Sequence, residues 1–173
     1  IVEINYDHIP FQTVLVPAEA KVVRLNLQKE GKEIGYIKGA GDEIPESLQQ
    51  IGYNISIIDP KDISSNMLKN FDAIIVGIRA YNTDEDLKFK QAILFDFVKN
   101  GGNMIVQYNT NHSLVTNDLA PFSLKLSRDR VTNENSEVNF LSPKHEILNF
   151  PNKITKDDFD GWVQERGLYF PNE

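Results

Sequence analysis

The sequence Phe71-Asp-Ala-Ile-Ile-Val-Gly-Ile-Arg-Ala-Tyr-Asn82 predicts both the central strand of the fold and the position of a functional site. Its first half is apolar and rich in β-branched residues, which is typical of a strand buried on both faces of a parallel sheet. Its second half brings Arg79, Tyr81 and Asn82 close together. Because open α/β sheets bind ligands at the carboxyl ends of their strands, we expect a site at the end of this one.

Three further strands and three helices are predicted to alternate with this one along the chain. The strands are expected at 33–38, 54–59 and 103–109, and the helices at 42–51, 62–70 and 83–100, the second of which could equally be a loop. This β-α-β-α-β-α-β order with short connections predicts an α/β fold with a doubly wound, mostly parallel sheet. After residue 110 the pattern loosens, and only 137–141 and 167–170 are predicted as strands.

The first 30 residues differ from the rest in being extended and interrupted by Pro10 and Pro17. We expect residues 1–30 to form an extended arm with short strands at 14–16 and 22–27, either as the tail of an upstream domain or as an edge hairpin. Residues 31–173 then form the α/β domain, which we expect to be truncated at its C-terminus. The chain begins in mid-pattern at Ile1, so we expect a piece of a longer protein, with its compartment, cytoplasmic or exported, left open.

Charge and composition disfavour several classes of partner. The 173 residues carry a net charge of −7 and no run of Lys or Arg, so neither a nucleic acid nor an anionic membrane surface is an expected partner. No apolar run approaches the roughly 20 residues of a membrane-spanning helix, and we predict no membrane insertion. The absence of cysteine excludes disulfides, thiolate catalysis and thiolate metal sites.

The ends of the first, third and fourth strands of the predicted sheet offer a set of polar groups. In a doubly wound sheet the first and third strands flank the point where the strand order reverses, which brings their ends together. A glycine loop at a helix N-terminus, a guanidinium, amides and phenols could bind a carboxylate, a phosphate or a sugar. The alternatives are a tight turn, an Arg79 ion pair with Asp42, Asp84 or Glu85, and a turn role for Asn82. The predicted ligand-binding residues are Gly39, Gly41, Asp42, Arg79, Tyr81, Asn82, Gln107 and Asn109.

The sequence supports catalytic residues less strongly than ligand-binding residues. His8, His112 and His145 lie on separate segments without the spacing of metal ligands, and we predict no metal and no cofactor. His112 follows the polar end of the fourth strand, and Asp158 and Glu165 belong to a carboxylate-rich segment near the C-terminus. These three could form an acid–base site, whereas a surface histidine and a surface ion pair with Arg166 are the simpler interpretation.

Several runs resemble the C-terminal region of large bacterial proteins of the LmbE/PIG-L deacetylase family. They are residues 35–42, 77–82, 107–109, 128–131 and most of 151–170, so the resemblance extends over nearly the whole chain. It implies a class I glutamine-amidotransferase-like, flavodoxin-like fold for this chain. It also implies an N-terminal domain, elsewhere in the parent protein, similar to zinc-dependent N-acetylglucosaminyl deacetylases.

Two departures from the family pattern shape the functional hypothesis. The His-Pro-Asp-Asp and His-x-x-His motifs of the deacetylase domain are absent, and Asp7-His8 does not replace them. The amidotransferase-like fold places a Cys on a sharp strand-to-helix turn, where this chain has Gln107-Tyr-Asn-Thr110. Thr110 or Ser113 could substitute as nucleophile, but neither has an evident His–acid pair.

The leading hypothesis is therefore a non-catalytic accessory domain of a deacetylase-type hydrolase. It would bind carbohydrate or pack against other domains of the same polypeptide. One alternative is a hydrolase that uses the carboxylates with His112. Another is an oligomerisation domain, for which Trp162 and Tyr169 would lie on an exposed apolar patch.

Overall fold

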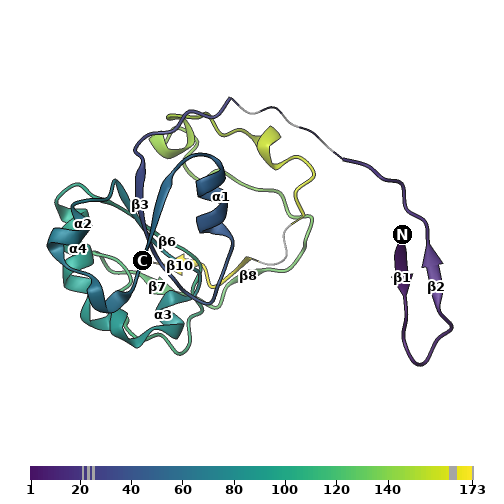
Figure 1. The fold of residues 1–173 in the computed structure, drawn as a ribbon, viewed down its shortest axis with the longest axis horizontal. Coiled ribbons are helices and arrows are strands. Elements are labelled where there is room, and N and C mark those ends of the chain that lie inside the picture. The colour runs from purple at the N-terminus through teal and green to yellow at the C-terminus, as the bar shows by residue number, and fades with distance from the viewer. Residues whose placement is uncertain (21, 23, 25, 164–166, 173) are drawn as a thin grey trace.

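A four-stranded parallel sheet forms the centre of the molecule in the computed structural model, which describes residues 1–20, 22, 24, 26–163 and 167–172. The strand order is β4-β3-β5-β6, and all neighbouring strands run parallel (Figure 1). Ile74 of β5 pairs with Gly35 of β3 on one side and with Met104 of β6 on the other. The predicted α/β class and the central position of the 71–82 stretch are thereby confirmed. The strands are β3 (Glu33–Ile37), β4 (Asn54–Ile58), β5 (Ala73–Val76) and β6 (Asn103–Val106).

Helices cover both faces of this sheet. On one face Ile37, Ile74 and Val76 are fully buried beneath α2, α3 and α4. On the other face Ile34, Tyr36 and Ile75 pack against α1. The alternation of buried residues along β3 and β5 explains why both faces carry apolar side chains. The helices are α1 (Ile44–Gln50), α2 (Ser65–Leu68), α3 (Ala80–Thr83) and α4 (Gln91–Lys99), with short 3-10 turns η1 (Pro60–Asp62), η2 (Glu85–Phe89), η3 (Glu146–Leu148) and η4 (Lys156–Phe159).

The predicted single helix over 83–100 is wrong, because this segment contains separate pieces. α3 has already begun at Ala80, and the carboxylate of Asp84 accepts the N–H of Asp86 to start η2. α4 begins only at Gln91, and Phe89, at the end of η2, is exposed. Local side-chain-to-backbone bonds of this kind compete with a continuous helix.

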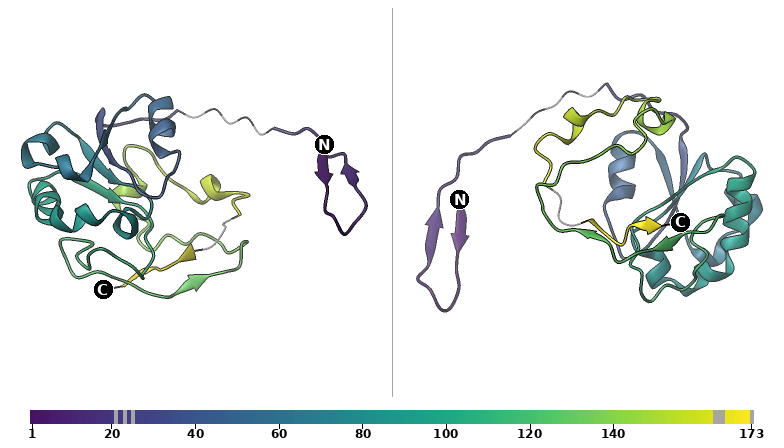
Figure 2. Two further views of the ribbon diagram at one scale, coloured as in Figure 1. Left: turned by 60° about the horizontal axis from the view of Figure 1, so that its bottom comes forward. Right: turned by 180° about the vertical axis from the view of Figure 1, so that it is seen from behind.

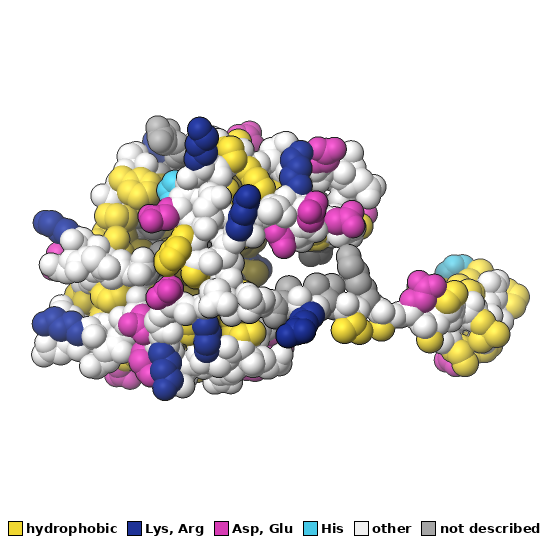
Figure 3. All heavy atoms as spheres, turned by 90° about the horizontal axis from the view of Figure 1, so that it is seen from above, with side chains coloured by type: hydrophobic (Ala, Val, Ile, Leu, Met, Phe, Trp, Pro, Cys, Tyr) yellow, Lys and Arg dark blue, Asp and Glu magenta, His cyan; other side chains and the backbone are white. Residues whose placement is uncertain are grey.

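The N-terminal residues form a hairpin that lies apart from the sheet (Figures 1 and 3). β1 (Val2–Ile4) pairs antiparallel with β2 (Gln12–Val14). The strand predicted at 14–16 therefore lies earlier in the chain. The strand predicted at 22–27 falls partly outside the described residues, and its described positions carry no strand. The hairpin exposes apolar side chains, and its connection meets the body where Gln28 and Asn152 exchange two hydrogen bonds of 2.8 and 2.6 Å.

The second half of the chain is held by short antiparallel pairings instead of a continuous sheet. β7 (Lys125–Leu126) pairs with β10 (Pro171–Asn172), and β8 (Arg130–Val131) pairs with β9 (Gly167–Leu168). The segment 125–131 thus runs alongside 167–172 (Figure 2). The strand predicted at 137–141 is wrong, since these residues form no regular element. Within the described ranges, no helix combines the length and apolar character needed to span a membrane.

Candidate functional site

The carboxyl ends of β3, β5 and β6 meet as the strand pattern predicts. The backbone N–H of Ala40, after β3, donates to Ile78 O at 2.7 Å, after β5. The turn at Gly39 packs so closely that a Cβ there would come within 2.8 Å of Ala80 N. Gly41 has a φ of +106°, which glycine adopts readily, and it faces open space. Both glycines therefore have a clear structural use in this turn.

Asp42 is the centre of a hydrogen-bond network at this junction. Tyr36 donates its hydroxyl to Asp42 Oδ2 at 2.5 Å and accepts from Gln107 Nε2 at 3.2 Å. Ile44 N donates to Asp42 Oδ1 at 2.9 Å, which ties the carboxylate to the start of α1. Asp42 thus precedes the first helical residue by two positions, and its carboxylate accepts a helix N–H although Glu43 is the N-cap residue.

This network shifts the pKa values of Tyr36 and Asp42 in opposite directions. Burial, followed by the hydrogen bond to Asp42 and its charge, raises the pKa of Tyr36 far above its ordinary value. Burial acts to raise the pKa of Asp42 as well. The hydrogen bonds from Tyr36, Ile44 and Ile78 together outweigh that effect, so the pKa of Asp42 is lowered. Tyr36 therefore stays a hydrogen-bond donor and Asp42 stays ionised at neutral pH.

Three other predicted ligand-binding residues use their side chains within the protein. Tyr81 is completely buried and donates its hydroxyl to Gln91 Oε1 at 3.1 Å. Asn109 accepts from Tyr81 N at 3.1 Å and donates to the Gln107 carbonyl at 2.8 Å. Asn82 accepts from the N–H of Thr110 at 3.0 Å. These residues fasten α3 to the end of β6, and their side-chain polar groups bond within the protein.

Arg79 is the member of the predicted set whose side chain projects into solvent. It has a φ of 57° and a ψ of 21°, the left-handed conformation, at the sharp turn between β5 and α3. That conformation costs a non-glycine residue about 1–2 kcal/mol. Within the described part of the chain Arg79 forms no ion pair, and the carboxylates of Asp84 and Glu85 bond to Asp86 and Lys88 instead.

A group of aromatic residues lies next to Arg79. The Arg79 N–H donates to Tyr108 O at 2.7 Å. The ring of Tyr169 lies 6.0 Å from that of Tyr108 and 5.9 Å, edge-on, from that of His112. Tyr169 and Ser113, the neighbour of His112, also adopt the left-handed conformation, with φ values of 58° and 56°. The described non-glycine residues with positive φ therefore converge here, as strained residues do at functional sites.

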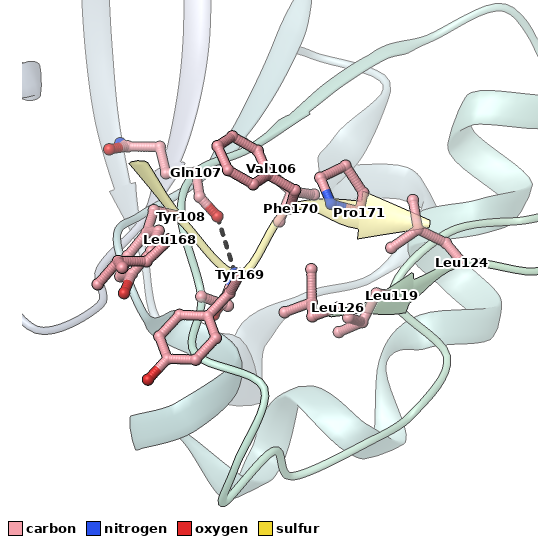
Figure 4. Close-up of a pocket in the computed structure, with 11 residues that line it drawn as sticks. Val106, Gln107, Tyr108, Leu119, Leu124, Leu126, Leu168, Tyr169, Phe170 and Pro171 are labelled. Carbon is pink, nitrogen blue, oxygen red and sulfur yellow. Dashed lines mark hydrogen bonds between the residues drawn. The ribbon is translucent and has the colours of Figure 1, made fainter. Parts of the chain in front are cut away.

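The two tyrosines of this aromatic group (Tyr108, His112 and Tyr169) line a cavity of about 270 Å³ (Figure 4). In the close-up, the ring of Tyr169 lies at one end, and Leu119, Leu124 and Leu126 lie at the other. The walls come from the end of β6, from the loop before β7 and from the returning segment 168–171. An apolar cavity with a few polar groups at its edge is the usual form of a small-molecule site.

A second hollow, of about 720 Å³, lies between α2 and α4 and includes Asp72 and Gly102. These residues precede β5 and β6, so the hollow is at the amino ends of the strands. Open α/β sheets bind their ligands at the opposite ends. The cavity beside Tyr169 is therefore the better candidate site.

The weak catalytic candidates do not assemble into an acid–base site among the residues described. His112 is exposed and belongs to the aromatic group. Asp158 lies in η4 and accepts from Thr155 N at 2.6 Å, which caps its own turn. Glu165 lies outside the described residues. The described ranges also contain no cluster of three His, Cys, Asp or Glu side chains that could hold a metal ion.

Sequence reasoning underestimated Tyr108 and Tyr169 as site residues. Tyr108 stands between the predicted residues Gln107 and Asn109, and this position at the polar end of a predicted strand was the available signal. Tyr169 carries no such local signal, because only the pairing of 167–172 with 125–131 brings it to β6. Comparisons with models of protein families, with curated proteins and with solved structures found no match for this chain.

Proposed function

We propose that this chain is a non-catalytic binding domain that holds a carbohydrate at the cavity beside Tyr108 and Tyr169. The observation that carries the proposal is the pair of tyrosine rings, 6.0 Å apart, beside an apolar cavity at the carboxyl end of the sheet. Sugars offer C–H faces that pack on aromatic rings and hydroxyls that bond to nearby polar groups. A site of rings and a few polar side chains suits such a ligand.

The same proposal includes the kind of fold and the kind of parent protein to which this domain belongs. The strand order β4-β3-β5-β6 agrees with the first four strands of the flavodoxin-like order 2-1-3-4-5. This supports a flavodoxin-like, amidotransferase-like fold and an accessory place in a protein of the LmbE/PIG-L family. The parent protein would then carry the deacetylase chemistry, and this chain would hold or orient its carbohydrate.

The arrangement around the strand ends supports a binding role over a catalytic one. The hydroxyl of Thr110 donates to the His112 carbonyl at 3.0 Å, so it lacks the basic partner that a nucleophile requires. The sharp turn after β5 carries Arg79, whose guanidinium cannot act as a nucleophile. Both positions favour holding a ligand over cleaving it.

A carbohydrate screen on residues 1–173, followed by calorimetry on the best ligand, tests the proposal. Tyr169→Asn removes the ring while placing at that position a residue that tolerates the left-handed conformation. Because an aromatic contact contributes about 0.5–1.5 kcal/mol, we expect this substitution to weaken binding roughly two- to tenfold. Tyr108→Ala should act in the same direction.

Tyr6→Ala is the matched control, because Tyr6 is an exposed tyrosine on the hairpin, far from the cavity along the chain. It should leave the affinity unchanged. If no carbohydrate binds, or if Tyr6→Ala weakens binding as much as Tyr169→Asn, the proposed function is wrong.

Self-association is a second candidate function, and one observation favours it. Trp162 is 57% exposed and stacks on Phe159 with their ring centroids 5.0 Å apart. A large exposed aromatic stack is a typical contact between proteins. Light scattering combined with gel filtration tests it: a dimer that Trp162→Ala converts to a monomer supports this role, and a wild-type monomer at high concentration contradicts it.

A further inference from the structure

We propose that the ligand at this site is an acidic carbohydrate, whose carboxylate or phosphate group is held by Arg79, Arg128 and Arg130. This inference rests on the proposed function and names the chemical class of its ligand. Carboxylates and phosphates share the geometry that a guanidinium recognises through two parallel N–H donors.

The first observation is where the arginines lie. The described residues include four arginines, and three of them lie on segments whose backbones bond to Tyr108 or Tyr169. Arg79 donates its backbone N–H to the carbonyl of Tyr108 at 2.7 Å. Arg128 and Arg130 stand on either side of Asp129, whose carbonyl accepts the N–H of Tyr169 at 3.0 Å.

The pairing of β8 with β9 indicates the side of the ribbon from which one of these arginine side chains projects. Arg130 is the cross-strand partner of Leu168, and Leu168 lines the cavity. Partners directly opposite in an antiparallel pair project from the same side of the ribbon. The Arg130 side chain therefore leaves the ribbon on the same side as the side chain of Leu168.

The second observation is that these cations form no ion pair with a described carboxylate. The ion pairs among the described residues all use lysine, at positions 61, 88 and 156. The side chains of Arg79, Arg128 and Arg130 are all exposed and take part in none of them. The carboxylate of Asp42, at the junction of β3 and β5, already accepts hydrogen bonds from the Tyr36 hydroxyl and the Ile44 N–H.

The contrast with the rest of the molecule strengthens this point. The chain as a whole carries a net charge of −7, so its overall charge repels anions. Three arginines without a described ion-pair partner, on segments whose backbones bond to Tyr108 and Tyr169, would instead attract an anionic ligand locally. A neutral sugar would gain nothing from them, whereas an acidic sugar would gain charge-assisted hydrogen bonds.

The test is a carbohydrate array in which each acidic glycan is paired with its neutral counterpart. Galacturonate oligomers are paired with their methyl esters, and sugar phosphates with the parent sugars. Calorimetry then measures the best pair at about 0.05 and 0.5 M salt, because added salt screens exposed charges. We expect the acidic member to bind at least roughly tenfold more tightly at low salt, with the difference shrinking at high salt.

Arg79→Gln, Arg128→Gln and Arg130→Gln should each remove part of this preference, by roughly three- to tenfold, without changing the affinity for the neutral member. Arg24→Gln is the matched control, since Arg24 is an exposed arginine on the arm. A thermal melt of each variant confirms that the fold is intact.

The outcomes separate this inference from the proposed function. Equal affinity for the acidic and neutral members overturns the inference and leaves carbohydrate binding standing. An equal loss with Arg24→Gln also overturns it, because the attraction would then not be local to the site. If no glycan binds, both proposals fail. The acidic partner that binds, uronate or phosphate, identifies the anion.

Discussion

Replacing Gly39 by alanine should destabilise the protein far more than the same change at Gly41, two residues later. An added Cβ at Gly39 would lie 2.8 Å from both Ala80 N and the Ile78 carbonyl carbon, and closer still to the Ile78 oxygen. All of these atoms belong to the backbone between β5 and α3, so no side chain can rotate away to make room. The turn itself must move.

The magnitude follows from what such a movement disrupts. Overpacking a tight site costs about 1–3 kcal/mol. The 2.7 Å bond from Ala40 N to Ile78 O would also be strained or lost, at a net cost of about 1 kcal/mol. We therefore expect Gly39→Ala to lower the free energy of unfolding by about 2–4 kcal/mol. For a chain of this length that corresponds to a fall in Tm of roughly 4–16 °C.

Gly41→Ala is the control, because its Cβ would meet nothing within 4 Å. Its φ of +106° is unfavourable for alanine, so we expect a smaller loss of about 1–2 kcal/mol. Urea unfolding followed by far-ultraviolet circular dichroism measures both variants against wild type. If Gly39→Ala costs no more than Gly41→Ala, the close approach of the two turns is not a constraint on this fold and the reasoning is refuted.

Three further predictions concern the hydrogen-bond network and the core. Tyr36→Phe should lower the free energy of unfolding by about 1–3 kcal/mol, since Asp42 and Gln107 lose their partner, and NMR titration should show the pKa of Asp42 rising. The folded protein binds the Asp42 proton less tightly than the unfolded chain does. The stability from this carboxylate is therefore present above its ordinary pKa of 3.8 and is lost as the pH falls through the lowered value. Urea midpoints measured across this pH range should fall less in Asp42→Asn than in wild type. Leu94→Ala, a truncation at a fully buried position of α4, should cost about 2–5 kcal/mol in the same unfolding assay, and a loss below 1 kcal/mol would contradict its place in the core.

The central sheet could be predicted from the sequence because its signals are local. The apolar runs of β3, β4, β5 and β6 are separated by glycine, proline and polar turns, and their alternation with helices prescribes parallel pairing. The meeting of Gly39 with the residues around Arg79 follows from that topology. By contrast, the start of α3 at Ala80 depends on a left-handed residue before it, which no propensity of arginine indicates.

At the carboxyl ends of the strands, the roles of the side chains were harder to predict than the positions of the residues. The sequence places Asp42, Tyr81 and Asn109 at strand ends, where they could equally bind a ligand or each other. Only the three-dimensional distances show that Tyr81 is buried against Gln91 and that Asn109 caps the start of α3. The place of Tyr169 beside β6 could not be predicted, because its neighbours in space are remote in sequence and their pairing has no strong pattern.

The pairing of 167–172 with 125–131 has a consequence for which part of the protein opens first by local unfolding. This segment is fastened by two short antiparallel pairings, whereas the central sheet is continuous. It should therefore open by local unfolding while the sheet stays closed, and its amides should exchange with deuterium well before those of β3 and β5. A ligand that touches both Tyr108 and Tyr169 would hold this segment against β6. Such a ligand would then slow exchange in 167–172 most, and the tail of the chain would report occupancy of the site.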